Sequence, residues 1–385
     1  MAESMNTSST DMQSEPAFVL KFAHQIQCEV HAGNGMLSHA GSLVRSLAGG
    51  VPKRAIIATD VNVRAVHGSI LVASLADAGL QVLWLTIPAG EEQKTLANVV
   101  DALGRLARAG AERHDVLVAL GGGVPGDLFG YVAASYMRGI RLVQVPTTLV
   151  AQVDSSIGGK VGVDLPEGKN LVGAFKHADR VIIDYTLLTT LPHDEWVAGT
   201  AEVAKHGVIA DRDLFEWLEE SAEGWRTHSV ELGPILAAAI QVKARIVQED
   251  ERETGLRMHL NYGHTLGHAL ETVAGYRGLR HGEAVAWGMA MEARLASRVG
   301  LSNADFVRRQ DRLLQSLGLL APLTPLDADA VYERLFLDKK VKAGRIRWVL
   351  PGRQPGNVVV RDDLPEGVVR ELIHATVEGR LLEAP

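Results

Sequence analysis

Histidine is a common metal ligand and proton carrier at neutral pH, and it clusters in one short stretch of this sequence. Of the 14 histidines, four lie between residues 259 and 281. His264 and His268 are four residues apart, on one face of a predicted helix, so spacing alone nominates them as a ligand pair. His281 follows 17 residues after His264 (281 − 264), and Glu202 offers a carboxylate. Two histidines and a glutamate with one open position are typical of catalytic zinc; the alternative is histidines that make only structural hydrogen bonds.

A second stretch combines lysines with glycines. Lys160 comes directly after two glycines. Lys169, nine residues further on (169 − 160), also comes directly after a glycine. Lysine beside flexible backbone can bind phosphate or carboxylate, so the pair suits a small substrate with two anionic groups. Asp154 and Asn170 add a carboxylate and an amide to the same stretch. The alternative is an exposed loop in which the lysines are simply solvated.

A glycine-rich turn follows an apolar run at residues 115–120. Residues 121–127 read Gly-Gly-Gly-Val-Pro-Gly-Asp and satisfy the pattern G-x-G-x-x-G, which lets backbone approach the pyrophosphate of a dinucleotide. The usual acidic ribose partner about 20 residues later is missing, because Arg141 stands there. Asp60, at the tip of an earlier predicted strand, is a candidate for that role. The alternative is a tight turn that needs glycine for steric reasons alone.

Elements of two kinds must position these residues. Buried strands are predicted at 54–60, 81–86, 115–120, 141–145 and 180–184, with helical segments between them such as 95–109. This alternation indicates a Rossmann-like α/β domain with a parallel sheet. After about residue 190 the apolar period becomes helical, at 198–209, 211–221, 232–247, 265–273 and 283–299. We therefore expect a disordered tail at 1–17, an NAD-binding α/β domain at 18–190 and a mainly helical metal- and substrate-binding domain at 191–385.

Composition excludes several classes of protein. Lys and Arg total 39 against 46 Asp and Glu, a net charge of −7, which argues against a nucleic-acid-binding protein. The single cysteine, Cys28, excludes an intrachain disulfide framework and a cysteine-rich zinc site. No apolar run reaches the roughly 18 residues of a membrane span, and no targeting segment is evident. We expect a cytoplasmic protein with neither a nucleic-acid nor a membrane partner.

Taken together, these segments resemble the 3-dehydroquinate synthase family, a branch of the sugar phosphate cyclases. The resemblance runs from about residue 20 to about residue 370, and the motifs occur in the family's order. Each motif alone is weak, whereas the ordered set is specific. The motifs are Gly121-Gly-Gly-Val-x-Gly-Asp127, Pro146-Thr-Thr148, Val153-Asp-Ser-Ser-x-Gly-Gly-Lys160, Gly168-Lys-Asn170, Ala201-Glu-Val-x-Lys205, Gly255-Leu-Arg257, Asn261-x-Gly-His-Thr-x-Gly-His268 and His281-Gly-Glu283.

The resemblance implies a role for each matching residue. The implied metal ligands, for Zn²⁺ or Co²⁺, are Glu202, His264 and His281, which makes His268 a catalytic residue instead of a ligand. The implied catalytic residues are His268, Lys160, Lys205, Glu253 and Asn170. The implied substrate-binding residues are Arg138, Asp154, Lys160, Lys169, Asn170, Lys205, Lys243, Arg257, Asn261, His268 and Lys340. The implied NAD-binding residues are Asp60, Glu91, Lys94, Gly122, Gly123, Val124, Asp127, Thr147, Thr148, Leu187, Thr190, Leu191 and Glu195. In this homodimeric family Arg138 would reach the site of the partner subunit.

The implied activity is that of a phosphate-eliminating carbon–oxygen lyase of the shikimate pathway, which makes aromatic amino acids. Its substrate, 3-deoxy-D-arabino-heptulosonate 7-phosphate, is transiently oxidised by NAD, loses phosphate, is reduced again and closes by an intramolecular aldol reaction to 3-dehydroquinate. The alternatives are another sugar phosphate cyclase, a metal-dependent polyol dehydrogenase, and a non-catalytic NAD- or metal-binding regulator. The joint presence of Arg257, Asn261 and His268 favours 3-dehydroquinate synthase activity over these alternatives.

Overall fold

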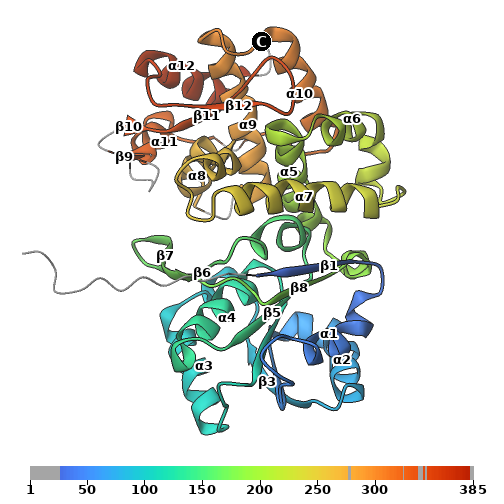
Figure 1. The fold of residues 1–385 in the computed structure, drawn as a ribbon. Coiled ribbons are helices and arrows are strands. Elements are labelled where there is room, and N and C mark those ends of the chain that lie inside the picture. Colours follow the sequence, from blue (N-terminus) through green and yellow to red (C-terminus); the bar gives the residue numbers. More distant parts are fainter. Residues whose placement is uncertain (1–26, 276–278, 324, 337–340, 343–344, 382–385) are drawn as a thin grey trace, which may run out of the picture.

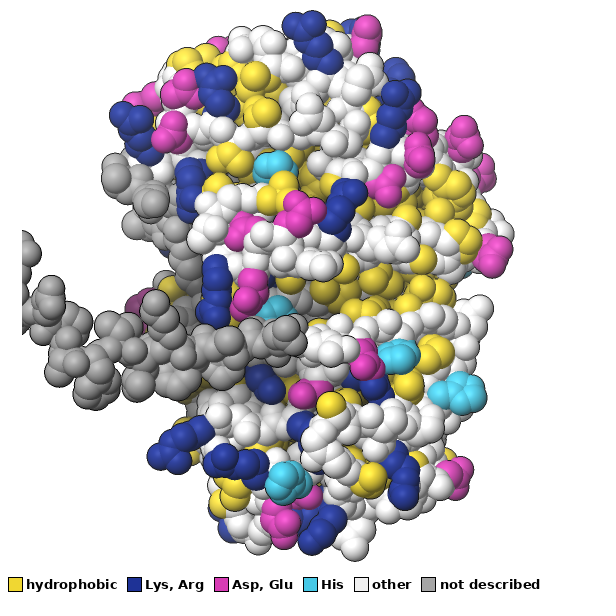
Figure 2. Space-filling model, in the orientation of Figure 1, with side chains coloured by type: hydrophobic (Ala, Val, Ile, Leu, Met, Phe, Trp, Pro, Cys, Tyr) yellow, Lys and Arg dark blue, Asp and Glu magenta, His cyan; other side chains and the backbone are white. Residues whose placement is uncertain are grey.

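The computed structural model describes residues 27–275, 279–323, 325–336, 341–342 and 345–381. The chain forms two halves. In Figure 1 the half built on a sheet lies at the bottom and the mainly helical half lies at the top. On the face shown in Figure 2, Lys and Arg side chains are interspersed with Asp and Glu and form no continuous basic field. Within the described residues, no helix is long and apolar enough to cross a membrane.

The lower half is built on a six-stranded sheet of order β1-β8-β5-β4-β2-β3, in which every neighbouring pair is parallel. The predicted α/β class is therefore confirmed, and the five predicted strands are all present. The strand that sequence reasoning missed is β1, a short edge strand with alternating exposure. The strands are β1 (Glu29–Gly33), β2 (Arg54–Asp60), β3 (Gln81–Ile87), β4 (Val116–Gly121), β5 (Arg141–Pro146) and β8 (Arg180–Asp184).

Helices cover both faces of this sheet. One buried cluster joins α1 and α2 to one face, and a second joins α3 and α4 to the other face and continues into the helical half. Because crossover helices return the chain to the same edge, the carboxyl ends of the strands meet below the helical half. The helices are α1 (Ala40–Arg45), α2 (Val61–Asp77), α3 (Leu96–Arg108) and α4 (Gly123–Ser135), with short helical turns η1 (Met36–His39), η2 (Glu91–Gln93), η3 (Tyr136–Arg138), η4 (Ala151–Ser155) and η5 (Tyr185–Thr190).

The lysine-rich stretch is an antiparallel hairpin of β6 (Lys160–Leu165) and β7 (Gly168–Phe175), not the loop that we expected. Gly162 pairs with Gly173 across the hairpin, and a Cβ on Gly162 would lie 2.5 Å from the Val172 carbonyl oxygen. These glycines therefore allow two backbones to approach closely, and they also hide the strand alternation in the sequence.

The upper half consists mainly of helices, as expected. The predicted helices at 198–209, 211–221, 232–247, 265–273 and 283–299 are present with longer bounds, and three further helices follow. They are α5 (His193–Ala210), α6 (Arg212–Arg226), α7 (Gly233–Glu249), α8 (His264–Val273), α9 (His281–Arg298), α10 (Ala304–Ser316), α11 (Ala328–Leu335) and α12 (Glu366–Val377), with η6 (Leu256–Asn261), β9 (Val341–Lys342), β10 (Arg345–Ile346), β11 (Trp348–Pro351) and β12 (Val358–Arg361).

Glycine lets α5, α8 and α9 pack backbone to backbone. A Cβ on Gly288 would overlap the Gly263 carbonyl, and one on Gly282 would overlap the Ala198 backbone. A Cβ on Gly267 would lie 2.8 Å from the Ala284 carbonyl oxygen. The three helices that carry the candidate metal ligands are thus held at close range.

The chain passes from the sheet half to the helical half between η5, which ends at Thr190, and α5, which begins at His193. We propose that the domains are 18–190 and 191–385, divided at this point. The predicted tail, 1–17, lies outside the described residues.

Candidate active site

A cleft of about 2150 Å³ lies between the two halves of the molecule. Its lower wall is formed by residues that follow β2, β4 and β5 and by the β6–β7 hairpin, and its upper wall by α5, α8 and α9. The predicted residues that line it are Asp60, Glu91, Lys94, Gly122, Gly123, Val124, Asp127, Thr147, Thr148, Asp154, Lys160, Lys169, Asn170, Thr190, Leu191, Glu195, Glu253, Asn261, His268 and His281.

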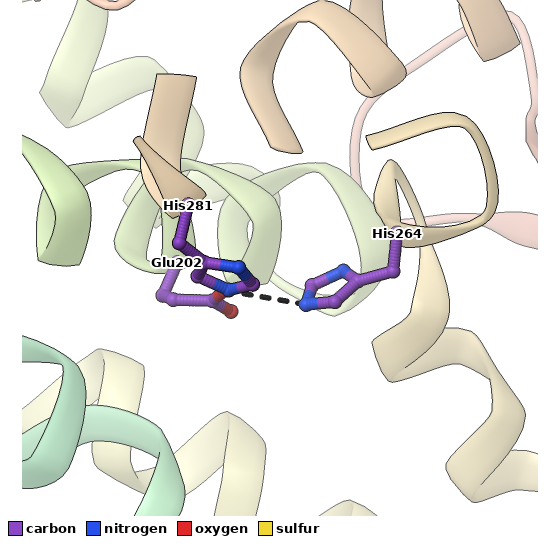
Figure 3. A group of neighbouring side chains, drawn as sticks. All are labelled: Glu202, His264 and His281. Atoms are coloured by element: carbon purple, nitrogen blue, oxygen red, sulfur yellow. Dashed lines mark ion pairs between the residues drawn. The ribbon is translucent and has the colours of Figure 1, made fainter. Parts of the chain in front are cut away.

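Three helices bring Glu202, His264 and His281 together (Figure 3). Glu202 lies in α5, whereas His264 and His281 are the first residues of α8 and α9. The Nε2 atoms of His264 and His281 lie 3.4 and 3.6 Å from Oε1 of Glu202. The spacing of His264 and His268 had suggested that these two histidines form the ligand pair. The structure instead groups His264 with Glu202 and His281.

The outer nitrogen of each histidine ring is already engaged. Nδ1 of His264 lies 3.1 Å from the carbonyl oxygen of Tyr262, to which it can donate, and Nδ1 of His281 lies 3.3 Å from Oε2 of Glu271. These bonds leave both Nε2 atoms directed at Glu202, which is the arrangement that orients histidine for a metal. Two imidazole nitrogens and a buried carboxylate oxygen fit a zinc-type ion.

Electrostatics keep the carboxylate of this group ionised. Burial alone would raise the pKa of Glu202, but the ammonium of Lys205 outweighs burial and holds the pKa well below its ordinary value. Burial and Lys205 lower the pKa of His264 to about 3, so this ring is neutral. Burial opposes charge on His281 too, yet Glu202 and Glu271 raise its pKa to about 9. Metal binding must therefore displace a proton from His281.

Each lysine of the hairpin pairs with a glutamate of the helical half. Nζ of Lys160 pairs with Glu253, whose other carboxylate oxygen accepts a 2.7 Å bond from the Asn261 amide. Nζ of Lys169 donates to Oε1 of Glu271 at 3.0 Å. These pairs place two ammonium groups in the cleft, where an anionic substrate would meet them.

Two further ion pairs involve lysines that are buried beside the cleft. Lys205 pairs with Glu202 one turn away on α5, and Lys243 of α7 pairs with Asp154 of η4. Burial alone would raise the pKa of Asp154, but Lys243 and Lys205 outweigh it and hold the pKa below its ordinary range. The Lys243–Asp154 pair therefore joins the helical half to the sheet half beside the metal ligands.

Arg257 differs from expectation in its contacts. Its side chain is 2% exposed, does not line the cleft, and donates to the carbonyls of Glu251 and Gly158. The family resemblance implies that Arg257 binds the substrate. In this structure backbone carbonyls accept from both terminal nitrogens instead.

Asp250 shapes the turn that carries Arg257 and Glu253. Its carboxylate accepts from the backbone N–H groups of Thr254, Gly255 and Arg257 at 2.9, 2.7 and 3.0 Å. Burial opposes ionisation, but these bonds outweigh it and lower the pKa of Asp250 to about 2.

Asp250→Ala is expected to destabilise the protein by about 2 kcal/mol at pH 7, because three backbone donors lose a charged acceptor. A carboxylate with a lowered pKa stabilises the fold above its unfolded pKa and ceases to do so as the pH falls through its folded pKa. The difference between wild type and variant, measured by urea unfolding, should therefore shrink as the pH falls from about 4 toward 2. A difference that is constant over this range would contradict the assignment.

The glycine turn leads straight into a helix. Gly121 has a φ of 153°, and Gly122 is the N-cap of α4, with no side chain bonded there. A Cβ on Gly122 would lie 2.9 Å from the Thr148 methyl group, so glycine is needed at this approach. Residues at the start of α4 line the cleft, and the first N–H groups of a helix have no intrahelical acceptor, which suits an anionic ligand.

Other predicted NAD residues surround this turn. Nζ of Lys94 donates 2.6 Å bonds to Asp127 and to Asn170. Asp60 caps α2 through Oδ1, which accepts from the N–H groups of Asn62 and Val63.

Among the described residues, Leu187 and Arg138 do not line the cleft. Leu187 is buried in the core beneath the cleft, with 4% of its surface exposed. Arg138 is exposed and follows α4, which starts at the carboxyl edge of the sheet, so it lies near the opposite edge and not in this cleft. Lys340 lies outside the described residues.

Sequence reasoning assigned no role to Glu271 or His206. Glu271 forms a second donor group with His268 and His281, and His206 forms a third with Asp154 and Glu202. His206 is fully buried, and neither ring nitrogen has a hydrogen-bond partner in the described structure. The sequence does hold a signal for both residues. His206 and Glu271 lie one helical turn from Glu202 and His268, respectively, on predicted helices.

Solved structures with this fold place the chain in a class. It matches 2-epi-5-epi-valiolone synthase from Streptomyces hygroscopicus subsp. jinggangensis, solved with NAD⁺ and Zn²⁺, at a TM-score of 0.84 and 28% identity over 95% of this chain and 99% of that one. It matches 2-deoxy-scyllo-inosose synthase, solved with carbaglucose-6-phosphate, NAD⁺ and Co²⁺, at 0.81 and 28% over 90% and 96%. Fold and site thus define a sugar phosphate cyclase.

The sequence comparisons narrow this class. Family models described as 3-dehydroquinate synthase N-terminal and C-terminal match residues 84–198 and 199–341. A 3-dehydroquinate synthase of Synechococcus sp. is 46% identical over 351 residues, which cover 90% of this chain and 95% of that protein. The chain belongs to the 3-dehydroquinate synthase family, which confirms the resemblance seen in the sequence.

Proposed function

We propose that this chain converts 3-deoxy-D-arabino-heptulosonate 7-phosphate to 3-dehydroquinate and phosphate, with NAD and Zn²⁺ or Co²⁺ as cofactors. The observation that carries the proposal is a cleft lined by a glycine turn at a helix start, by two lysines and by His281, which belongs to the zinc-type donor group with Glu202 and His264. Family membership points to the same reaction.

Glu202, His264 and His281 would hold the metal, and the turn at Gly122 and Gly123 would hold the NAD pyrophosphate. When bound, the metal supplies a Lewis acid for substrate hydroxyls, and NAD supplies a hydride acceptor that is regenerated in each turnover. The buried pairs Lys205–Glu202 and Lys243–Asp154 support this proposal, because they hold the donor carboxylate ionised and fix the cleft wall.

The hairpin residues would bind the anionic groups of the substrate. Lys160, Lys169 and Asn170 all line the cleft on the sheet side. Their positions would hold the phosphate while it leaves. His268 lines the helical side, next to His281, with the ring centroids 5.9 Å apart. A histidine there can carry a proton to or from substrate oxygen at neutral pH, so positioning and proton transfer are the contributions of the chain itself.

We also propose a cytoplasmic homodimer. Arg138 supports the dimer proposal, because a residue matched to a substrate-binding position lies outside its own cleft, where it can serve a partner subunit. The presence of one cysteine supports a reducing compartment.

A single assay tests the proposed reaction. The purified protein, given the heptulosonate phosphate, NAD⁺ and Zn²⁺, is expected to release one phosphate per 3-dehydroquinate formed, with no accumulation of NADH. NADH formed in step with substrate loss would indicate a polyol dehydrogenase instead. Phosphate release from sedoheptulose 7-phosphate or glucose 6-phosphate, but not from the heptulosonate phosphate, would indicate another cyclase.

A further inference from the structure

We propose that Glu271 is a positioning residue that serves the metal site and the anion-binding hairpin with one carboxylate. This inference rests on the proposed metal site and deepens it. Glu271 lies in α8, and its side chain is only 8% exposed. Its two oxygens contact different partners: Oε2 lies 3.3 Å from Nδ1 of His281, and Oε1 accepts a 3.0 Å bond from Nζ of Lys169.

The contact with His281 determines which ring nitrogen is available to a metal. A proton on Nδ1 that is donated to Glu271 leaves the lone pair of His281 on Nε2, and Nε2 is the atom that faces Glu202. For His264 the same task falls to a backbone carbonyl, that of Tyr262. A carboxylate is the stronger acceptor, and partners of this kind typically account for 10–100-fold in metal affinity.

A second arrangement of the donors is possible, because His268, Glu271 and His281 also form a three-donor group. In that arrangement Glu271 would itself be a ligand, and His281 would bind the metal through Nδ1 instead of Nε2. The first group is favoured because it contains Glu202, which is 1% exposed and whose Oε1 faces the Nε2 atoms of both His264 and His281. Glu271, in contrast, already has a partner on each oxygen.

The contact with Lys169 reaches across the cleft. Lys169 lies in β7 of the sheet half, and Glu271 in the helical half. An anionic substrate group that binds Lys169 must share the ammonium with Glu271 or replace Glu271. The same carboxylate therefore strengthens metal binding and weakens anion binding, and its removal should move the two affinities in opposite directions.

Glu271→Gln in the full-length, metal-free protein tests this. Zinc affinity, measured by competition with a chromophoric chelator, is expected to fall about 10–100-fold. Affinity for inorganic phosphate, measured by calorimetry without metal, is expected to rise by up to about fivefold, because the ammonium of Lys169 loses the charge of Glu271 at 3.0 Å, while Glu91 remains 3.9 Å away. General damage to the fold would weaken both, so the opposite signs identify the proposed role.

Two further variants serve as controls. Glu219→Gln removes a carboxylate that pairs with Arg309 on the far side of the helical half and should change neither affinity. Lys169→Met should lose phosphate binding and keep the zinc affinity, since the contact between Glu271 and His281 remains.

Unchanged zinc affinity in Glu271→Gln, or a parallel loss of zinc and phosphate binding, would overturn the inference while leaving the metal site intact. Zinc binding that disappears in Glu271→Gln but survives in Glu202→Gln would place the metal in the second donor group and would also overturn it. Failure of the wild-type protein to bind zinc would refute the metal site itself.

Discussion

Replacement of His264 by alanine is expected to abolish both zinc binding and turnover. His264 supplies one of only two imidazole nitrogens in the donor group, and the two remaining donors cannot hold a zinc ion in tetrahedral geometry. Zinc content of the purified variant, measured by atomic emission, should be near zero at zinc concentrations that saturate the wild type. The variant should fold, because the substitution removes a polar side chain at the first residue of α8 and no member of the buried apolar clusters.

His268→Ala is the matched control, one helical turn away on α8. It should retain zinc and lose most of its activity, because His268 lines the cleft without belonging to the group of Glu202, His264 and His281. Loss of a proton-transfer residue typically costs about 10²–10⁴-fold in rate. Equal zinc contents in the two variants would contradict the assignment of His264 as a ligand and His268 as a non-ligand.

Lys243→Met is expected to destabilise the folded protein by about 3–5 kcal/mol, the usual cost of leaving a buried charge without its partner. The variant removes the direct partner of the Asp154 carboxylate, while Lys205, which itself pairs with Glu202, still lies near it. Because the Asp154 side chain is 20% exposed, the loss should lie at the lower end of this range. Equilibrium unfolding in urea measures the loss, and activity should fall with it, because Asp154 lines the cleft.

A double-mutant cycle separates the pair from each residue alone. Asp154→Asn combined with Lys243→Met removes both charges, so it should be more stable than the Lys243→Met variant. A double variant whose destabilisation equals the sum of the two single effects would show that the pair contributes nothing.

The sheet half could be predicted from sequence because its strands are continuous apolar runs. Four of the six strands are buried along nearly their whole length, and such runs, separated by helical periods, allow few other interpretations. β1 was missed because it is an edge strand of five residues with only partial burial. Its pairing with β8 joins residues about 150 positions apart, which no local pattern reveals.

The hairpin and the metal site depend on contacts that local spacing cannot encode. Gly162 and Gly173 interrupt the alternation of β6 and β7, so this segment resembled a loop. The spacing of His264 and His268 correctly indicates one helix face, yet the carbonyl of Tyr262 turns His264 toward Glu202 on another helix. The family resemblance supplied that ligand set, and periodicity did not.

The glycine contacts among α5, α8 and α9 have a consequence for the evolution of this fold. Because a single added methyl group at Gly282 or Gly288 would collide with the backbone of a neighbouring segment, the scaffold of the metal ligands tolerates little sequence drift. In β7 of the hairpin, Gly173 is restricted in the same way, but every residue of this strand is half-buried or exposed. New substrate preferences should therefore arise on the sheet side of the cleft, while the helices that hold the ligands are inherited almost unchanged.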